Sequence, residues 1–251
     1  AVNVLMTNQG TIGDYAGINM VKKSCLPLIA IPTTAGTSSE ITNVCALIDT
    51  EKVRKYVVID ANLTPSSVIA DPEFTRTMPA GVTAATGMDA ITHAIESYVS
   101  NMASPLTEYH ALKGLEILYK NLPAAVKDGN DMKAREQMML GCIITGFSFS
   151  NANLGLVHGI AHTLSAHFGL ASCPKKTAKL AEAIGLTPCG DPDKDKKQFS
   201  EALRKLTRIV GIQTLSEQGI QEKDLEMLAK DVMEEPVLAF NPRQEITEED
   251  V

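Results

Sequence analysis

The sequence predicts an α/β region followed by an all-α region. Residues 26–31, LPLIAI, form an apolar run without a polar interruption, which is typical of a strand buried on both faces of a parallel sheet. Three further short runs rich in Val, Ile and Leu follow before Pro72. From Pro72 onward, apolar residues recur at helical spacing instead. We therefore expect a first domain over residues 1–71 and a second over residues 72–251.

The segment after the first strand has the composition of an anion-binding loop. Residues 33–40, TTAGTSSE, combine small and hydroxyl-bearing side chains with one glycine, so backbone N–H groups and hydroxyls can approach an anion closely. Composition alone favours a plain polar turn. The place of the segment after a buried strand favours a phosphate or dinucleotide site, because open α/β sheets bind ligands at the carboxyl ends of their strands.

Three later strands are expected at residues 45–49, 55–60 and 66–71, with charged turns between them. Lys55 begins the second of these strands, just after a turn. A lysine in this place can reach a phosphate or a ribose, although such side chains are more often solvated.

The second region is expected to be a set of amphipathic helices. One begins near Pro105, a residue favoured in the first turn of a helix, and Ser104 or Asn101 can cap it. The other helices are expected at residues 133–147, 151–167, 174–185, 197–210 and 222–233. The charged run at residues 191–197, DPDKDKK, is expected to be a solvated loop.

Two pairs of potential metal ligands lie four residues apart in the helical region. Asp89 and His93 form one pair, within GMDAITHAIESY at residues 87–98, and His158 and His162 form the other. A spacing of four places two side chains on one face of a helix, close enough to hold a common ion. A single pair of this kind also arises often by chance, in any helix with two polar residues on one face.

The distribution of the histidines favours a metal or a bound ligand over chance. The chain has 5 histidines, and 3 of them, His158, His162 and His167, lie within ten residues amid Ala, Gly, Leu and Ile. Burying so many polar rings without partners would be costly. A carboxylate together with imidazoles suits a borderline divalent metal such as iron(II) or zinc, which could polarise a substrate oxygen.

Composition narrows the class of protein. A net charge of −7 and a pI near 5.3 lack the basic footprint of a nucleic-acid-binding protein. The sequence contains no run of about eighteen apolar residues, so no membrane span is expected. The 5 cysteines include no C-x-x-C pair, which favours a reducing cytoplasm over a disulfide framework.

Four stretches resemble the iron-containing (group III) alcohol dehydrogenases, the family that includes lactaldehyde reductase and 1,3-propanediol dehydrogenase. The stretches are PLIAIPTTAGTSSEIT, IADPEFTRTMPAGVTAATGMDAITHAIESYVS, FSNANLGLVHGIAHTLSA, and NPR near the end of the chain. Glycerol dehydrogenase and dehydroquinate synthase are more distant relatives. The resemblance implies a dehydroquinate-synthase-like fold, with a partial Rossmann-like nucleotide domain, a helical metal-binding domain, and the metal and NAD(P) in the cleft.

The resemblance also implies a reaction, the reversible NAD(P)-linked transfer of hydride between a primary or small alcohol and its aldehyde. The matching metal ligands are Asp89, His93 and His158, for Fe²⁺ with Zn²⁺ as the alternative. The matching cofactor residues are Thr33, Thr34, Thr37, Thr42 and Lys55. His162 matches a histidine near the nicotinamide and the substrate, where it could relay the proton that the alcohol loses as hydride leaves.

The chain departs from the family pattern in three places. It begins after the point where the Gly-Gly-Gly-Ser phosphate turn of the family lies, and it stops at EEDV before a closing helix. The fourth metal ligand of the family, a histidine in a Pro-His-Gly context, is missing where HFGL runs into ASCPKK. His167 is a poor substitute, because nine residues beyond His158 correspond to about 180° round a helix.

Two explanations of these departures compete. Either the sequence omits segments of a longer enzyme, or the chain is a truncated, non-catalytic remnant or interaction module of the same fold. We favour the first, because the joint loss of a ligand, a phosphate turn and a helix would expose the core and leave a three-ligand site. NAD rather than NADP, a cytoplasmic location and a homodimer or larger homo-oligomer are the further expectations, while the alcohol itself is left open.

Overall fold

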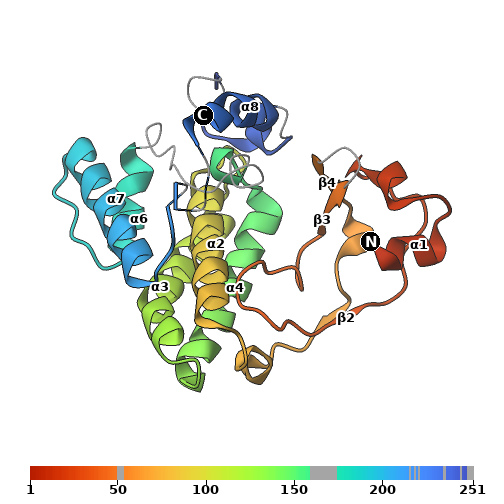
Figure 1. The fold of residues 1–251 in the computed structure, drawn as a ribbon, viewed down its shortest axis with the longest axis horizontal. Coiled ribbons are helices and arrows are strands. Elements are labelled where there is room, and N and C mark those ends of the chain that lie inside the picture. The colour runs from red at the N-terminus through yellow and green to blue at the C-terminus, as the bar shows by residue number, and fades with distance from the viewer. Residues whose placement is uncertain are drawn as a thin grey trace.

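The computed structural model describes residues 1–49, 54–158, 174–214, 216–217, 219, 221–233, 236–243 and 245–247. In this part of the chain, strands occur only before Pro72 and the long α-helices only after it. Figure 1 shows the strand-containing region on the right and the helices in the centre and on the left. The predicted fold class, α/β followed by all-α, is confirmed.

Two small sheets make up the strand-containing region. The first has the order β1-β4-β3 and consists of β1 (Gly17–Ile18), β4 (Arg54–Ile59) and β3 (Val44–Asp49). Strand β1 is parallel to β4, whereas β3 is antiparallel to it. In the second sheet, β2 (Ile29–Ala30) is parallel to β5 (Ser67–Val68). The strands predicted at residues 45–49 and 55–60 are thus confirmed to within one residue at each end.

The first sheet packs against helix α1 (Val2–Thr7) through a small core of its own. Val4 and Val58 are fully buried, and Tyr15 and Val21 complete the cluster. Four apolar side chains contribute only about 6–12 kcal/mol by burial, which is little for a region of this length. Partly buried side chains, Ile12, Cys25, Cys45 and Leu63, pack against this cluster.

Strand β2 is shorter and more exposed than the sequence predicts. It contains two residues, and Ile29 and Ile31 are 62% and 47% exposed. Pro27 and Pro32 bracket it, and a proline cannot donate a hydrogen bond to a sheet. Among the described residues β5 is its only strand partner, so little of its surface is covered. The expectation of a strand buried on both faces is wrong, and the strand predicted at residues 66–71 is likewise reduced to β5.

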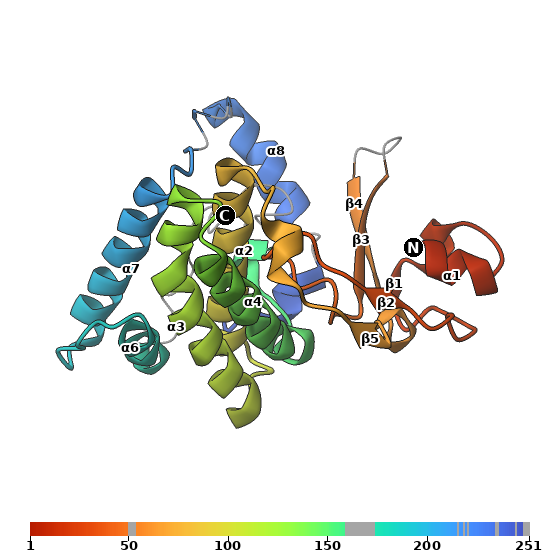
Figure 2. The ribbon, with the colours of Figure 1, turned by 90° about the horizontal axis from the view of Figure 1, so that it is seen from below.

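Three long helices form the centre of the second region: α2 (Ala80–Val99), α3 (Pro105–Lys127) and α4 (Met132–Ala152). Helices α6 (Pro174–Ala183) and α7 (Pro192–Ile209) pack against α3, on the side away from the strands (Figure 2). Helix α8 (Glu222–Met233) lies near one end of α2 (Figure 1). The fully buried core side chains include Ile91, Ile95, Leu115, Leu118, Leu122, Leu180, Phe199 and Leu203.

The helices predicted at residues 133–147, 174–185 and 222–233 correspond to α4, α6 and α8. Within the described ranges, every helix is too short or too polar for a membrane span.

Side-chain caps set the beginnings of several helices, among them α3 and α7. Ser104 caps α3 as predicted, since its Oγ accepts a hydrogen bond from the backbone N–H of Thr107 at 3.3 Å and Pro105 follows it. Asp191 caps α7 in the same way, and Pro192 occupies the first turn. The solvated loop predicted at residues 191–197 is therefore wrong. Its aspartates favour a helix start, because negative charge in the first turn stabilises the helix dipole.

The helix predicted at residues 151–167 is interrupted. Helix α4 continues to Ala152 and ends at Asn153, whose φ of 59° lies in the left-handed region. Residues 153–155 are irregular, and residues 156–158 are helical again. A side chain at position 155 would clash with Asn241, because a Cβ on Gly155 would lie 2.9 Å from Asn241 Oδ1. The rest of the predicted helix falls outside the described residues.

Candidate metal centre

Helix α2 presents Asp89 and His93 on one face. The two residues are one helical turn apart, and His93 Nε2 lies 3.7 Å from Asp89 Oδ1. Ile91 and Ile95, on the opposite side of the helix, are buried in the core and fix its rotation. His93 is buried, whereas the side chain of Asp89 remains 36% exposed. The pair therefore lies at the edge of the core, with the carboxylate on the accessible side.

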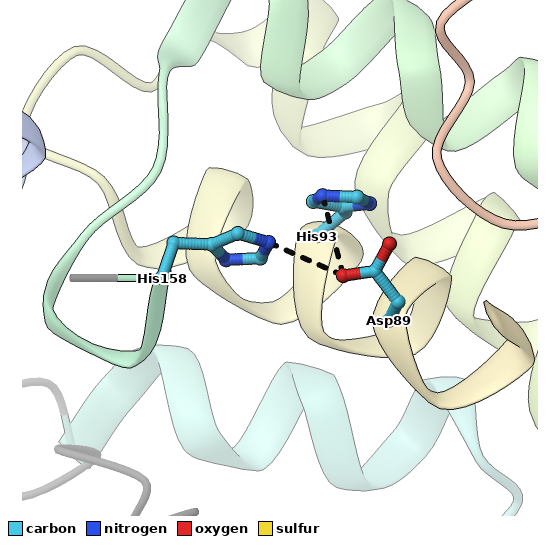
Figure 3. Close-up of side chains that lie close together, drawn as sticks. All are labelled: Asp89, His93 and His158. Atoms are coloured by element: carbon cyan, nitrogen blue, oxygen red, sulfur yellow. Dashed lines mark ion pairs between the residues drawn. The ribbon is translucent and has the colours of Figure 1, made fainter. Parts of the chain in front are cut away.

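His158 joins this pair from the short segment that follows α4, residues 153–158. Its Nε2 atom lies 3.4 Å from Asp89 Oδ1, and its ring stacks on the ring of His93 with centroids 4.4 Å apart (Figure 3). Phe149 of α4 stacks on the other face of His93 at 4.3 Å. One donor atom from each of Asp89, His93 and His158 lies within 4.8 Å of the other two. Two segments far apart in the sequence thus converge on one small group of ligand atoms.

Two side chains that the sequence did not single out as site residues, Glu96 and Asn241, hold the segment that carries His158. Glu96 Oε1 accepts hydrogen bonds from the backbone N–H groups of Val157 at 2.7 Å and His158 at 3.3 Å, and Glu96 Oε2 pairs with His158 Nδ1. Asn241 Oδ1 accepts a hydrogen bond from the N–H of Leu156 at 3.2 Å. A signal for Glu96 was present, because it lies three residues after His93 on the same face of an apolar helix.

Charges around His158 set its protonation state. Burial by itself would lower the pKa of this imidazole, but the carboxylates of Glu96 and Asp89 outweigh burial and raise the pKa to about 9. The ring therefore carries a proton at neutral pH when no metal competes for it. A metal that binds at Nε2 must displace that proton.

The predicted cofactor loop packs against the metal-ligand helix and its neighbour. Ser38 Oγ donates a hydrogen bond of 2.7 Å to the carbonyl of Cys142 in α4. Gly36 lies against Thr86 of α2, where a Cβ would be 2.6 Å from the Thr86 carbonyl oxygen. Thr86 is one turn before Asp89. The loop therefore reaches the beginning of the helix segment that carries the candidate ligands.

The four predicted threonines lie on this one loop with different exposures. Thr42 is buried, Thr34 is half-buried, and Thr33 and Thr37 are exposed. An open cavity of about 400 Å³ adjoins the loop, and Pro32, Ser39, Glu40 and Thr42 are among the residues that line it. Glu40 is itself buried, and burial raises the pKa of its carboxyl group.

The side chains of two predicted site residues, Lys55 and His162, lie outside the described part of the structure. Lys55 lies in β4 with its backbone opposite Ile48, but its side chain is outside the described residues. His162 lies outside them entirely, as does His167. Within the described ranges the donor cluster holds three residues, without a counterpart of the family's fourth histidine.

Two family profiles together match most of the chain. The profile described as iron-containing alcohol dehydrogenase matches residues 1–72. The profile for the C-terminal part of the Fe-containing alcohol dehydrogenase family matches residues 83–173 and 170–251. The chain belongs to the iron-containing alcohol dehydrogenase family. The family predicted from the sequence is thus confirmed, and so is the class of protein, an oxidoreductase of the alcohol dehydrogenase type.

Individual members of the iron-containing alcohol dehydrogenases show how far the likeness extends. Alcohol dehydrogenase 4 of Saccharomyces cerevisiae is 40% identical, with 97% of this chain and 68% of that protein covered. The NAD-dependent methanol dehydrogenase of Bacillus methanolicus is 36% identical, with 97% and 69% covered. A crystal structure of 1,3-propanediol oxidoreductase has a TM-score of 0.93 at 34% identity, with 99% and 70% covered.

The place where the chain departs from the family is visible in the profile match. The two segments matched by the C-terminal profile meet at residues 170–173. This is where the sequence runs from HFGL into ASCPKK, the discontinuity at which the fourth histidine ligand was expected.

Proposed function

We propose that this chain is a metal-dependent, NAD-linked alcohol dehydrogenase in which Asp89, His93 and His158 hold a divalent metal beside the bound nucleotide. The observation that carries the proposal is the donor cluster: one carboxylate and two buried imidazoles whose ligand atoms lie within 4.8 Å of one another. Such a cluster in a member of this family supports the ligand assignment residue by residue.

The donor set fits the metal that the family description names. One carboxylate oxygen and two imidazole nitrogens suit iron(II), and zinc is the alternative because it accepts the same donors. When bound, the metal supplies a Lewis acid that lowers the pKa of an alcohol hydroxyl. Three protein donors also leave coordination positions for a substrate, as catalytic sites require.

The residues around the donor cluster have different proposed roles. Phe149 and the stacked rings of His93 and His158 close the inner side of the site and exclude water there. Asp89, which is partly exposed, borders the side from which an alcohol can enter. His162 is proposed as the proton relay from the resemblance alone.

The loop at residues 33–42 is proposed to hold the dinucleotide. Its docking on α2 and α4 supports this role, because a nucleotide bound along it would extend toward Asp89. The adjoining cavity offers Thr42 and Ser39 as hydroxyl donors. Glu40 suits a ribose hydroxyl better than a phosphate, since a carboxylate accepts hydrogen bonds and repels anions. Lys55 remains the candidate for a phosphate. NAD is favoured over NADP by the NAD-dependent relative from Bacillus methanolicus.

The remaining assignments are coarser. We assign residues 1–71 to dinucleotide binding and residues 72–251 to metal binding.

A homodimer or larger assembly is supported by adjacent exposed side chains on α3 and α4, Tyr109 and Phe147, which flank His110. A cytoplasmic location is supported by the free thiols of the described cysteines, Cys25, Cys45, Cys142 and Cys189. Sedimentation of the active protein as a monomer would contradict the assembly.

The activity test is NAD reduction by small primary alcohols such as methanol, ethanol and 1,3-propanediol. A chelator should abolish the activity, and Fe²⁺ or Zn²⁺ should restore it. Asp89→Asn keeps the shape of the side chain but removes its charge, and it should lower kcat/KM at least about 100-fold, equivalent to ~2.7 kcal/mol.

Glu116→Gln is the matched control, because it removes an exposed carboxylate on α3 and should leave the rate unchanged. Metal-loaded protein that reduces neither NAD nor NADP with any of these alcohols would contradict the proposal. It would favour the non-catalytic module instead.

A further inference from the structure

We propose that Glu96 is a positioning residue that fixes both the ring and the backbone of His158, so that its Nε2 atom faces Asp89 and His93. The inference rests on the metal site proposed above, and it concerns a residue that does not itself touch the metal or the substrate. Three contacts carry it, all from one carboxylate: two with backbone N–H groups and one with the imidazole.

Glu96 is buried, although it carries a carboxylate. Its residue exposure is 5%, and it lies on α2 among apolar neighbours such as Ile95 and Val99. A buried carboxylate is costly unless its oxygens are satisfied by hydrogen bonds. The N–H groups of Val157 and His158 and the Nδ1 atom of His158 provide these bonds. In the described structure, the hydrogen bonds of the Glu96 carboxylate therefore all go to the segment that carries His158.

Glu96 lies in register with Asp89 and His93 along α2. Asp89, His93 and Glu96 follow one another at spacings of four and three, which places them within about 60° on one face of the helix. The same helix thus carries two candidate ligands and the carboxylate that places the third. The position of His158 relative to Asp89 therefore depends on a carboxylate that shares α2 with Asp89 and His93.

The contact with Glu96 also favours one tautomer of His158. In the ring that carries a single proton, Nδ1 keeps that proton and donates a hydrogen bond to Glu96 Oε2, so Nε2 has the lone pair, and Nε2 is the atom 3.4 Å from Asp89 Oδ1. A carboxylate behind a metal-bound histidine orients the ring and increases its basicity. The backbone contacts to Glu96 Oε1, together with Asn241 at the N–H of Leu156, satisfy the first N–H groups of the helical residues 156–158.

Glu96→Gln separates this role from simple packing. The amide has the same shape and can still accept from the two backbone N–H groups through its oxygen. Its NH₂ group then faces Nδ1, which must become an acceptor, so in the ring that carries a single proton this proton lies on Nε2 and blocks the atom that binds metal. The probe is Co²⁺, titrated into the metal-free protein and followed by its visible absorption spectrum and by competition with a chelator.

We expect Glu96→Gln to weaken Co²⁺ binding by about 10–100-fold and to change the visible spectrum, while the far-ultraviolet circular dichroism stays as in the wild type. Glu116→Gln should leave affinity and spectrum unchanged. Equal affinity and an identical spectrum for Glu96→Gln would overturn the positioning role. If Glu96→Gln fails to fold, Glu96→Asp is used in its place. Aspartate keeps the negative charge, but its side chain is one methylene shorter, so the carboxylate lies further from Nδ1 of His158. Wild-type affinity of Glu96→Asp for Co²⁺ would likewise overturn the positioning role.

The wild type and Asp89→Asn distinguish this inference from the proposed function. A wild-type chain that binds no Co²⁺, or whose binding survives Asp89→Asn unchanged, would overturn the metal site and the role of Glu96 together. A wild type that binds Co²⁺ in an Asp89-dependent manner, with Glu96→Gln indistinguishable from it, would overturn the role of Glu96 alone.

Discussion

At the scale of single residues, the spacing of Asp89 and His93 was sufficient to predict that they meet, because helix geometry alone brings them together. The partnership with His158 could be expected only from the resemblance, since about sixty residues separate it from α2. Glu96 was missed because a glutamate on a helix is usually solvated. Its hydrogen-bond partners, Val157 and His158, lie on a segment about sixty residues further along the chain.

Glu40 gives a prediction of pH-dependent stability. Burial raises the pKa of its carboxyl group above the ordinary 4.5, so the folded state favours the protonated form. The stabilising contribution of Glu40 is fully present below pH 4.5 and is lost as the pH rises through the folded-state value. Glu40→Gln removes this loss, and it should raise the melting temperature relative to the wild type at pH 8 but hardly at pH 4.

The measurement for Glu40 is thermal unfolding followed by circular dichroism across that pH range. Glu116→Gln serves as the control, because its exposed partner Lys113 provides an ion pair worth only about 0–1 kcal/mol. A Glu40→Gln melting temperature that lies at or below the wild-type value at pH 8 would contradict the argument.

At the scale of elements, periodicity predicted the long helices well but not their ends. The predicted helix at residues 151–167 overlooked Asn153 and Gly155, although both residue types commonly end helices. The charged run after Asp191 was assigned to solvent, although an aspartate followed by proline is a helix-start signal. Both predictions relied on the average composition of a segment, although one or two residues in that segment determine where the helix begins or ends.

The docking of the cofactor loop on α2 depends on Gly36. A methyl group at this position would meet backbone as well as side-chain atoms of Thr86, and backbone cannot move aside cheaply. Gly36→Ala should therefore cost about 1–3 kcal/mol of stability and shift the loop. We expect the affinity for NAD to fall about tenfold, equivalent to ~1.4 kcal/mol, while the metal content stays the same.

Gly81→Ala is the matched control for that experiment. Gly81 lies in the first turn of α2, and no atom lies within 4 Å of the position that an alanine methyl group would take, so alanine should be neutral or slightly stabilising there. Binding of NAD is measured by quenching or calorimetry on metal-loaded protein. Unchanged NAD affinity in a destabilised Gly36→Ala variant would show that the loop does not bind the cofactor.

At the scale of the whole molecule, the order of the two regions was predictable because each has its own periodicity. The burial of the first strand was not, because burial depends on what else packs against it, and β2 has only β5 beside it in the described structure. Alcohol dehydrogenase 4 of Saccharomyces cerevisiae extends beyond the shared region, since this chain covers 68% of its length. The three candidate ligands nevertheless converge within the part of the chain that the structure describes.

The most direct test of the central claim is a crystal structure of the protein grown with Fe²⁺ or Zn²⁺, with diffraction measured at the absorption edge of that metal. We expect an anomalous peak bonded to an oxygen of Asp89 and to ring nitrogens of His93 and His158, at about 2.0–2.2 Å from each. We further expect His158 to bind through Nε2, with Nδ1 on Glu96. A peak elsewhere, or fully occupied metal that leaves these three side chains unbonded, would contradict the account.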